Sequence, residues 1–315
     1  MISILIPTYN RVSLLAETIG SALSQTRSDL EIVVVDNCST DTTWDYLQQL
    51  ATQHSCIRIF RNGSNFGPVR NWSRCVDEAR GQYAKILWSD DIMDAHFLEK
   101  TIPLLETHAD IGFVYSNYSS FTDHPKDSDA QTDFGPSGIF PTNAYILKNF
   151  TGSPTPVSPG NAVFRLDDLK KSLLVDIPNK VGSDFATHAI GNDLLIYLLT
   201  ASKYPKYAVI AENLIHFRVH DGAISMTSGE KKLTLHYNLA RAYFAETYRP
   251  DLIPILNSQI LLSILGCKEA TKYGLDSISN FYISSGRTQF DWAFLALRLL
   301  KKATSTVTHA FQFNR

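Results

Sequence analysis

Residues 30–36, Leu-Glu-Ile-Val-Val-Val-Asp, form a run that is apolar and β-branched at most positions. Such a strand is buried on both faces, which is typical of a parallel sheet covered by helices. We expect further strands at 2–6 (ended by Pro7), 57–60, 83–88 and 112–116, helices at 13–25 and 95–107, and helices that end near 50 and 79. Strands that alternate with helices predict a right-handed, mostly parallel α/β sheet.

Two adjacent carboxylates, Asp90 and Asp91, come directly after the apolar run 83–88. Near the mouth of a buried sheet these groups repel each other and lose solvation. A divalent cation would cancel that penalty, and hard oxygen ligands suit Mg²⁺ or Mn²⁺. A helix cap for residues 95–107 is the alternative. On this stretch alone the metal site and the cap are equal alternatives.

The composition and net charge exclude some classes of protein and favour others. A net charge of −2 gives no case for nucleic acid as the main partner. At 315 residues, with 44% hydrophobic residues, the chain suits one large domain with an appendage. Its four cysteines lack CxxC spacing, so we expect reduced thiols in the cytoplasm. We expect neither a signal peptide nor a spanning helix, because no apolar run approaches about 20 residues.

The loop after the first strand contains no glycine, so the dinucleotide-binding fingerprint is absent, and no P-loop motif occurs. A nucleotide at this sheet edge must therefore be held by side chains and a metal. Tyr9 can flank a base, and Asp36 can accept a hydrogen bond from a base N–H. Asp90 can reach ribose hydroxyls, while Asp91 holds the metal. Arg70 can face the same cleft. Helix capping by Asp36 and a solvated Arg70 are the alternatives.

Four stretches resemble the successive motifs of glycosyltransferase family 2, in order and in spacing. They are Ile-Leu-Ile-Pro-Thr-Tyr-Asn-Arg at 4–11, Val-Val-Val-Asp-Asn-Cys-Ser-Thr-Asp at 33–41, the Asn-Phe-Gly and Arg-Asn of 65–71, and Ser-Asp-Asp at 89–91. The resemblance is strong over residues 2–116 and patchier to 226. It implies a GT-A fold, with a Rossmann-like central sheet flanked by helices, and transfer of a sugar from a nucleotide-sugar with inversion.

The resemblance also implies which residues bind ligands. The nucleotide-sugar residues are Pro7, Thr8, Tyr9, Arg11, Asp36, Arg70, Ser89, Asp90, Arg218 and His220, and the metal residues are Asp91 and His220. In one departure, the family's Asp-x-Asp triplet reads Ser89-Asp90-Asp91, so a hydroxyl replaces the first carboxylate. We therefore expect Asp91 to be the main direct metal ligand and the affinity for metal to be modest.

Two polar segments, 117–141 and 151–160, lack periodicity and are expected to be loops, which at this length are usually functional or mobile. Residues 161–165 then read as a strand that returns to the sheet, followed by a helix from Leu166. By similarity to the family, the sequence Pro-Gly-Asn at 159–161 would form the floor of an acceptor site. Backbone placement and direct contact are equal alternatives there.

Residues 189–197 begin a helix with Asp193 near its N-terminus. The family places its catalytic carboxylate in an acidic pair at this point, and Asn192 replaces the first acid here. Asp193 is then the candidate base, which deprotonates the acceptor hydroxyl as that hydroxyl attacks the anomeric carbon. A helix-capping aspartate is the alternative reading, and Asp184 is the competing base.

A strand and turn are expected at 214–225, and alternation places His216, Arg218 and His220 on one face. Cationic side chains beside a glycine-containing loop suit a departing diphosphate. The Arg-x-His pattern also resembles family members that act on bacterial surface polysaccharides. We expect His220 to act at this site, also as a metal ligand, and His216 to be structural.

The C-terminal region is expected to be helical, and the family pattern is lost there. Apolar residues recur at helical spacing over 233–248, 252–265 and 290–302. On a helical wheel of the last segment, an arc of about 100° contains the polar residues Asp291, Arg298, Lys301 and Lys302. This pattern suits an interfacial membrane helix over 288–302. It equally suits a helix packed on its own domain or on another subunit.

We therefore predict a GT-A domain at 1–228 and a C-terminal helical region at 229–315. The first domain comprises a nucleotide-sugar-binding half at 1–116 and an acceptor and catalytic half at 117–228. The predicted activity is inverting transfer of a hexosyl or deoxyhexosyl group, dependent on Mn²⁺ or Mg²⁺, to a growing glycan. The expected acceptor is a lipid-linked bacterial surface polysaccharide of the O-antigen or capsule type, at the cytosolic face of the inner membrane.

Two alternative functions assign the chain to a different class of protein. A nucleotidyltransferase typically uses a first loop rich in Gly and Arg or Lys, which is missing here. A non-catalytic nucleotide-sugar-binding or scaffold subunit stays an alternative because Ser89 and Asn192 stand in place of acids. Donor hydrolysis separates the enzyme from the binding subunit. Assembly into a homo-oligomer is left open.

Overall fold

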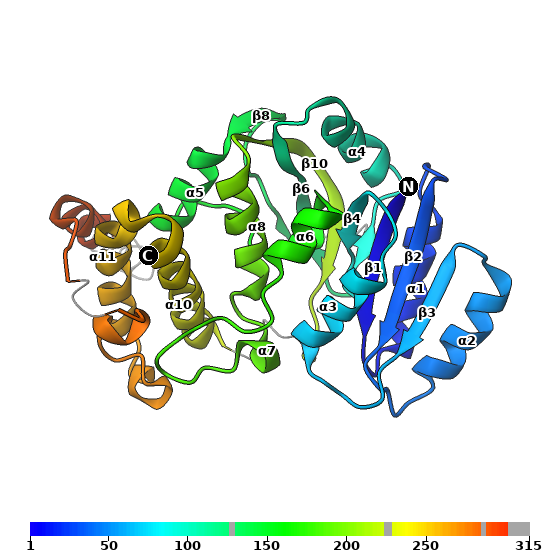
Figure 1. Cartoon of the computed structure of the whole chain (residues 1–315), viewed down its shortest axis with the longest axis horizontal. Helices are drawn as coiled ribbons and strands as arrows, with labels where there is room; N and C mark the ends of the chain where they lie inside the picture. Colours follow the sequence, from blue (N-terminus) through cyan, green and yellow to red (C-terminus); the bar gives the residue numbers. More distant parts are fainter. Residues whose placement is uncertain (126–129, 224–228, 285–287, 302–315) are drawn as a thin grey trace, which may run out of the picture. The chain divides into compact units, whose positions relative to one another are not determined.

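The protein is described by a computed structural model over residues 1–125, 130–223, 229–284 and 288–301 (Figure 1). The chain divides into two compact units. The first unit contains Met1–Asn149, Ser153–Ile177 and Asp184–Gly229. The second unit contains Phe150–Gly152, Pro178–Ser183 and Glu230–Arg315.

A central sheet organises the first unit. Its strand order is β3-β2-β1-β4-β9-β6-β10-β5, with β7 beside β6 and β8 beside β10. The strands in the described residues are β1 (Ile2–Thr8), β2 (Leu30–Asp36), β3 (Ile57–Arg61), β4 (Tyr83–Ile86), β5 (Ile92–Met93), β6 (Ile111–Phe121), β7 (Ala130–Gln131), β8 (Gly138–Pro141), β9 (Ala162–Arg165) and β10 (Lys206–Arg218).

The central pairings are mostly parallel. β1 pairs in parallel with β2 and β4, β2 with β3, and β6 with β10, while β9 is antiparallel to both β4 and β6. The helices of this unit are α1 (Val12–Leu23), α2 (Thr43–Gln53), α3 (Pro68–Glu78), α4 (Phe97–Thr107), α5 (Thr142–Thr151, whose last two residues belong to the second unit), η2 (Pro159–Asn161), α6 (Leu166–Ser172), α7 (Phe185–His188) and α8 (Asn192–Lys203). The predicted α/β fold, with a mostly parallel sheet flanked by helices, is confirmed.

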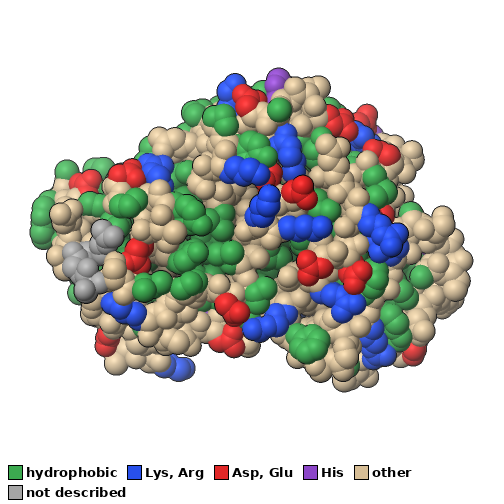
Figure 2. Space-filling model, viewed as in Figure 1, with side chains coloured by type: hydrophobic (Ala, Val, Ile, Leu, Met, Phe, Trp, Pro, Cys, Tyr) green, Lys and Arg blue, Asp and Glu red, His purple; other side chains and the backbone are tan. Residues whose placement is uncertain are grey.

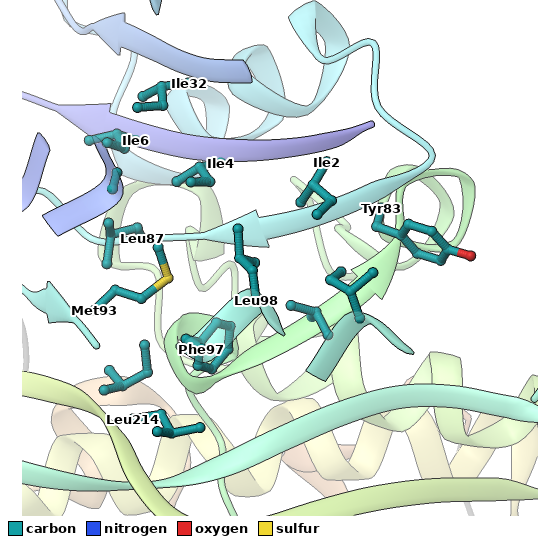
Figure 3. Close-up of a cluster of buried hydrophobic side chains, with 14 of the residues drawn as sticks. Ile2, Ile4, Ile6, Ile32, Tyr83, Leu87, Met93, Phe97, Leu98 and Leu214 are labelled. Carbon is teal, nitrogen blue, oxygen red and sulfur yellow. The ribbon is translucent and has the colours of Figure 1, made fainter. Parts of the chain in front are cut away.

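Alternate side chains of β1 build the hydrophobic core of this sheet. Ile4 and Ile6 are fully buried and lie in one cluster with Ile32 of β2 and with Phe97 and Leu98 of α4 (Figure 3). The strand register places Ile4 beside Ile32. Helix α3 also packs against β1 and β2. The core thereby holds the carboxyl ends of β1, β4 and β10 along one edge, where ligands bind in open α/β sheets.

Two predictions on secondary structure were wrong. Strand β1 does not end at Pro7 but continues to Thr8, because the pairing with β4 stops at Leu5 and a missing N–H is tolerated where only one neighbour pairs. Residues 117–141 are not one loop, since β6 extends to Phe121 and β7 and β8 follow. The polar side chains of β6 fit a sheet because they find partners, as Ser119 Oγ does at 2.7 Å from His216 Nδ1. Residues 126–129 of the predicted loop lie outside the described residues.

The second unit is helical over its described part. Its elements are α10 (Glu230–Tyr248), η3 (Pro250–Leu252), α11 (Ile253–Leu265), η4 (Ala270–Tyr273), η5 (Ile278–Phe281) and a last helix at 292–301. Lys302, which we placed on the polar arc, and residues 224 and 225 of the predicted turn lie outside the described residues. Among the residues described, no single helix is long and apolar enough to cross a membrane. One pair, Pro250–Leu265 with Ala270–Phe281, meets that test jointly across a bend of 119°.

Candidate functional site

Three side chains from distant parts of the first unit meet around one carboxylate oxygen. Asp90 Oδ2 lies 2.8 Å from Arg11 Nη1 and 2.9 Å from His220 Nε2. Arg11 Nη1 and His220 Nε2 are themselves 2.8 Å apart, and Arg11 Nη2 donates to the Gly222 carbonyl at 3.0 Å. Arg11 follows β1, Asp90 follows β4 and His220 follows β10, so the cluster marks the carboxyl edge of the sheet. It combines groups that can bind a phosphate with a carboxylate that can bind a hydroxyl or a cation.

Asp91 points into the protein, where it is only 4% exposed. Its Oδ1 accepts a hydrogen bond from the backbone N–H of Arg218 at 2.9 Å. Burial, followed by the charge of Asp90, raises the pKa of Asp91 well above its ordinary value, although the Arg218 N–H and the Lys85 ammonium favour its ionised form. The positive charge of the described side chains is therefore not enough to keep the pKa of Asp91 at its ordinary value.

Arg218 holds this acidic turn in place. Its Nε donates to the Asp90 carbonyl at 3.0 Å, and its Nη2 lies 2.8 Å from Glu17 Oε2. Its guanidinium covers the Phe121 ring at 4.6 Å. The side chain is nearly buried by these contacts, so they fix the position of Asp90 and Asp91. Direct binding of a diphosphate by Arg218 stays a prediction. Val219 and His220 continue from the strand, whereas His216 bonds to Ser119 and burial lowers its pKa.

Lys85, which the sequence analysis did not single out, is fully buried in β4 beneath this turn. Its Nζ donates to the Ile86 carbonyl at 2.7 Å and also to the Gly160 carbonyl of η2. Burial lowers the pKa of Lys85 to about 7, against the favourable charge of Asp91. The sequence contained a signal for Lys85, because it is a charged residue in the otherwise apolar run 83–88. A lysine in such a run needs buried hydrogen-bond partners.

The segment that Lys85 binds is packed closely against the turn. Trp88 Nε1 donates to Ser158 Oγ at 2.9 Å. A Cβ at Gly160 would lie 2.7 Å from Trp88 Nε1, so glycine is required at this position. Tyr197 of α8 places its hydroxyl 2.9 Å from Asn161 Oδ1. Pro159, Gly160 and Asn161 are all buried, and backbone placement and direct contact with an acceptor stay alternatives.

The buried ammonium predicts a pH dependence of stability. Between a folded-state pKa near 7 and the ordinary lysine value of 10.5, the unfolded chain binds a proton that the folded chain lacks. The free energy of unfolding should therefore rise with pH in this window, with a slope of up to about 1.4 kcal/mol per pH unit. We expect Lys85→Met to reduce that slope, as measured by urea denaturation at several pH values. Lys170→Met, an exposed lysine, is the control and should leave the slope unchanged. Equal slopes in wild type and Lys85→Met would show that the ammonium keeps its ordinary pKa.

The predicted nucleotide residues lie at the ends of β1 and β2. Pro7 and Thr8 are buried in β1, and Tyr9 is exposed just after it. Thr8 Oγ1 is buried and has no hydrogen-bond partner in the part of the chain that the structure describes. A buried hydroxyl without a partner is costly, so a ligand group that bonds to it would be favoured. Ser89 is also buried at this edge, in the turn after β4.

Asp36 is completely buried and already has protein partners. Both of its oxygens lie 3.2 Å from the Ser39 N–H, and Ser39 Oγ donates to Oδ1. Arg61 Nε forms an ion pair with Oδ2 at 3.2 Å. These bonds support the turn after β2, which is the structural reading of Asp36. Base recognition by Asp36 stays a prediction, and Arg61 is a partner that the sequence analysis missed.

The described contacts of Arg70 are with Asp176 and Asp184, which are not members of the Asp90 cluster. It forms an exposed ion pair with Asp176 at 3.5 Å. Its charge also helps to lower the pKa of Asp184, after the larger effect of the Thr187 hydroxyl. The structure thus places Arg70 of α3 beside the start of α7.

The two candidate bases differ in their surroundings. Asp193 is buried in the first turn of α8, where Oδ1 accepts from the N–H groups of Gly191 at 3.0 Å and Leu194 at 2.8 Å. Asp184 is exposed and caps α7 through bonds from the Thr187 N–H at 3.1 Å and hydroxyl at 2.6 Å. Because Tyr197 ties α8 to η2, Asp193 lies on the helix that is joined to the Asp90 turn. Which of the two acts as the base stays a prediction.

Asn192, the residue that replaces an acid, is buried in α8. Its Nδ2 donates to the carbonyls of Leu174 at 2.8 Å and Val175 at 3.2 Å. A carboxylate at this position could not make those bonds, because it has no hydrogen to donate. Asn192 therefore supports the chain before α7 through its side-chain amide.

The donor groups fit a cation that shares its ligands with a bound phosphate. Among the described residues, no group of three or more His, Cys, Asp or Glu side chains is placed to hold a metal ion. Asp91 supplies a buried carboxylate, Asp90 is already paired with Arg11, and His220 supplies an imidazole whose two nitrogens contact Asp90 and the Gly222 N–H. Mg²⁺ commonly takes one or two protein carboxylates and completes its shell with phosphate oxygens and water. The residues present fit that kind of site and not an all-protein cage.

Comparisons with known proteins identify relatives of this chain. The family model "Glycosyl transferase family 2" matches residues 3–173. The chain is 26% identical over 248 residues to the putative colanic acid biosynthesis glycosyl transferase WcaA of Escherichia coli, covering 77% of this chain and 81% of that protein. It is 34% identical over 118 residues to the UDP-Glc:alpha-D-GlcNAc-diphosphoundecaprenol beta-1,3-glucosyltransferase WfaP of Escherichia coli, covering 38% of this chain.

The extent of these matches differs between relatives. The chain spans 46% of the length of WfaP and 47% of a putative teichuronic acid biosynthesis glycosyltransferase from Bacillus subtilis. Among solved structures, it resembles S. aureus TarS in complex with UDP-GlcNAc, with a TM-score of 0.63 and 16% identity. That likeness covers 87% of this chain and 75% of the other and shows the fold, which is of the GT-A type. Since the family model covers more than half of the sequence, the chain belongs to glycosyl transferase family 2.

Proposed function

We propose that this protein is a metal-dependent, inverting glycosyltransferase that moves a sugar from a nucleoside-diphosphate donor to a hydroxyl of a growing bacterial glycan. The observation that carries the proposal is the cluster of Arg11, Asp90 and His220 above the buried Asp91, at the carboxyl edge of the sheet. Family membership sets the reaction class, and the cluster supplies groups for a sugar diphosphate.

The donor diphosphate is proposed to lie at this cluster. Arg11 and His220 can donate to its oxygens, and the orphaned Thr8 hydroxyl can bond to the nucleoside beside Tyr9. Mn²⁺ or Mg²⁺, held by Asp91 and His220, would neutralise the charge that develops on the leaving diphosphate. Asp90 is free to exchange its bond to Arg11 for bonds to sugar hydroxyls once Arg11 binds phosphate.

Asp193 is the proposed base. Its carboxylate takes the proton of the acceptor hydroxyl while the acceptor oxygen forms a bond to the anomeric carbon. The bond between that carbon and the diphosphate oxygen breaks in the same step, and the diphosphate leaves with the electron pair. A single displacement of this kind inverts the configuration of the anomeric carbon. A positioned base contributes about 10²–10⁴ in rate.

The acceptor and the cellular site are proposed from the relatives. WfaP is named for a GlcNAc-diphosphoundecaprenol acceptor, and WcaA for colanic acid biosynthesis. We infer a lipid-linked surface polysaccharide of the O-antigen or capsule type as the acceptor class. Four free cysteines are consistent with a reducing compartment, here the cytosolic face of the inner membrane.

A screen for thermal stabilisation by UDP-, dTDP- and GDP-sugars, with and without Mn²⁺, tests the donor proposal. The matching donor should stabilise the protein by about 2.7 kcal/mol at a hundredfold excess over its Kd, and more weakly without the metal. The nucleoside monophosphate is the control, because it lacks the diphosphate. Hydrolysis of the donor by the purified protein distinguishes an enzyme from a binding subunit. If no donor stabilises the protein and none is hydrolysed, the proposed function is wrong.

A further inference from the structure

The last helix of the second unit, residues 292–301, turns its apolar side outward. Six of its residues are exposed and form what we call the apolar strip: Trp292, Ala293, Ala296, Leu297, Leu299 and Leu300. The exposed fractions are 69% for Trp292, 51% for Leu297, 49% for Leu299 and 65% for Leu300. In Figure 2, hydrophobic side chains reach the surface at the left-hand end, where Figure 1 draws this helix in red. The described residues of the second unit therefore leave these side chains uncovered, although the helix does pack on that unit through Asp291 and Leu295.

The strip is continuous around the helix. At about 100° per residue, its six members span an arc of roughly 160° without an interrupting polar residue. Lys301 is exposed at one edge of that arc. Leu295, which lies outside the arc, is 7% exposed and is the large apolar side chain that the helix buries.

Contacts within the second unit set this orientation. The start of the helix is tied to α11, since Asp291 N–H donates to the Pro254 carbonyl at 3.1 Å and Ser258 Oγ to the Asp291 carbonyl at 3.1 Å. Asp291 Oδ1 also caps the helix by accepting from Phe294 N–H at 2.9 Å. On the polar side, the Arg298 guanidinium lies against Gly152. The helix is thus anchored by its polar side, and the apolar strip stays exposed.

Charge is distributed unequally between the two parts of the chain. Residues 230–315 carry 11 Lys and Arg against 6 Asp and Glu, whereas residues 1–229 carry 18 against 25. The region that bears the apolar strip is therefore basic, although the whole chain has a net charge of −2. A basic surface with an exposed apolar helix face complements an anionic lipid surface.

We propose that the apolar strip inserts into the interface of an anionic lipid bilayer, with the basic C-terminal region facing the lipid head groups. This goes beyond the proposed transfer reaction, because it assigns a second binding surface outside the donor site. A bilayer is favoured over a second copy because a helix of ten residues is only about 15 Å long. One face of it is small against the roughly 800 Å² per partner of a stable protein interface. Trp292 at one end suits the head-group boundary, where tryptophan is enriched.

Sedimentation of the full-length protein with vesicles tests this surface. One set of vesicles is phosphatidylcholine with one third phosphatidylglycerol, and the other is phosphatidylcholine alone. We expect tighter binding to the anionic vesicles by roughly tenfold or more, and weaker binding as salt is raised. The double variant Leu297→Gln, Leu300→Gln should lose binding by at least about tenfold, because two exposed side chains of the strip become polar. Leu265→Gln is the matched control, since Leu265 is 75% exposed but lies outside the strip, and it should bind as the wild type does.

Stabilisation by the donor should be equal in all three proteins, which shows that the variants fold and keeps this test separate from the proposed function. The proposal is overturned if the wild type does not sediment with anionic vesicles, or if the double variant sediments as the wild type does. Light scattering tests the alternative that a second copy of this chain binds the strip. A wild-type dimer that becomes a monomer in the double variant would assign the strip to a second copy and also overturn the proposal.

Discussion

Asp193→Asn is expected to lower the rate of sugar transfer by about 10²–10⁴ while leaving donor affinity nearly unchanged. Asp193 Oδ1 accepts hydrogen bonds from the N–H groups of Gly191 and Leu194. Asparagine keeps an acceptor oxygen there, so the start of α8 should stay folded. An amide cannot take the proton of the acceptor hydroxyl, so the loss falls on the chemical step. A lower kcat with an unchanged donor Kd is the mark of an interaction made mainly in the transition state.

Asp184→Asn is the matched control for this experiment. Asp184 is exposed and caps the short helix α7 through Thr187, so its replacement should cost little activity. Initial rates of transfer and donor binding by calorimetry measure both effects. A reversal, with Asp184→Asn severe and Asp193→Asn mild, would identify Asp184 as the base. If neither variant changes the transfer rate, the inverting mechanism proposed for this chain is wrong.

Removal of the divalent cation is expected to abolish transfer, and Asp91→Ala to weaken donor binding in the presence of Mn²⁺. Asp91 is only 4% exposed, and burial raises its pKa, so a bound cation would favour its ionised form. Asp91→Asn keeps an oxygen for the Arg218 N–H but removes the charge. We expect it to lower transfer by about 10² or more, the size seen when one group that stabilises developing charge is removed.

Asp94→Asn provides the control for the metal experiment. Asp94 lies three residues beyond Asp91 and bonds through Oδ1 to the His96 N–H at 2.8 Å, a bond that asparagine retains. Transfer should be near normal in this variant and should still require Mn²⁺ or Mg²⁺. The measurements are transfer rates in excess EDTA, followed by rates after Mn²⁺ is restored. Full activity in excess EDTA would refute the metal role of Asp91 and His220.

The pattern of apolar residues was sufficient to predict the sheet and its class. The β-branched runs of β1 and β2 and the helices between them follow from side-chain periodicity, which is a local property of the chain. Local patterns were insufficient where polar residues form strands. Ser119 and Asn117 belong to β6 because partners in other strands and loops satisfy their side chains, as His216 and the Phe134 N–H do. Those partners are remote in the sequence.

In the candidate site, too, local motifs identified residues, whereas only the tertiary structure shows their contacts. The motifs identified Arg11, Asp90 and His220 separately, yet their contacts cross 79, 130 and 209 positions of sequence. No local rule predicts that one Asp90 oxygen contacts both Arg11 and His220, or that Asp36 already binds Ser39 and Arg61. Lys85 was missed because its partners, Asp91 and the Gly160 carbonyl, come together only when η2 returns to β4.

By itself, the sequence determined the α/β class, the family motifs and the amphipathic character of the last helix, since each depends on residues that are close in the chain. Only the tertiary structure decided which side of that helix faces outward and which of Asp193 and Asp184 is buried. Those outcomes depend on anchors far away, such as Pro254 for the last helix and Asn161 for α8. Amphipathicity states that a helix has two faces, and only packing decides which face is covered.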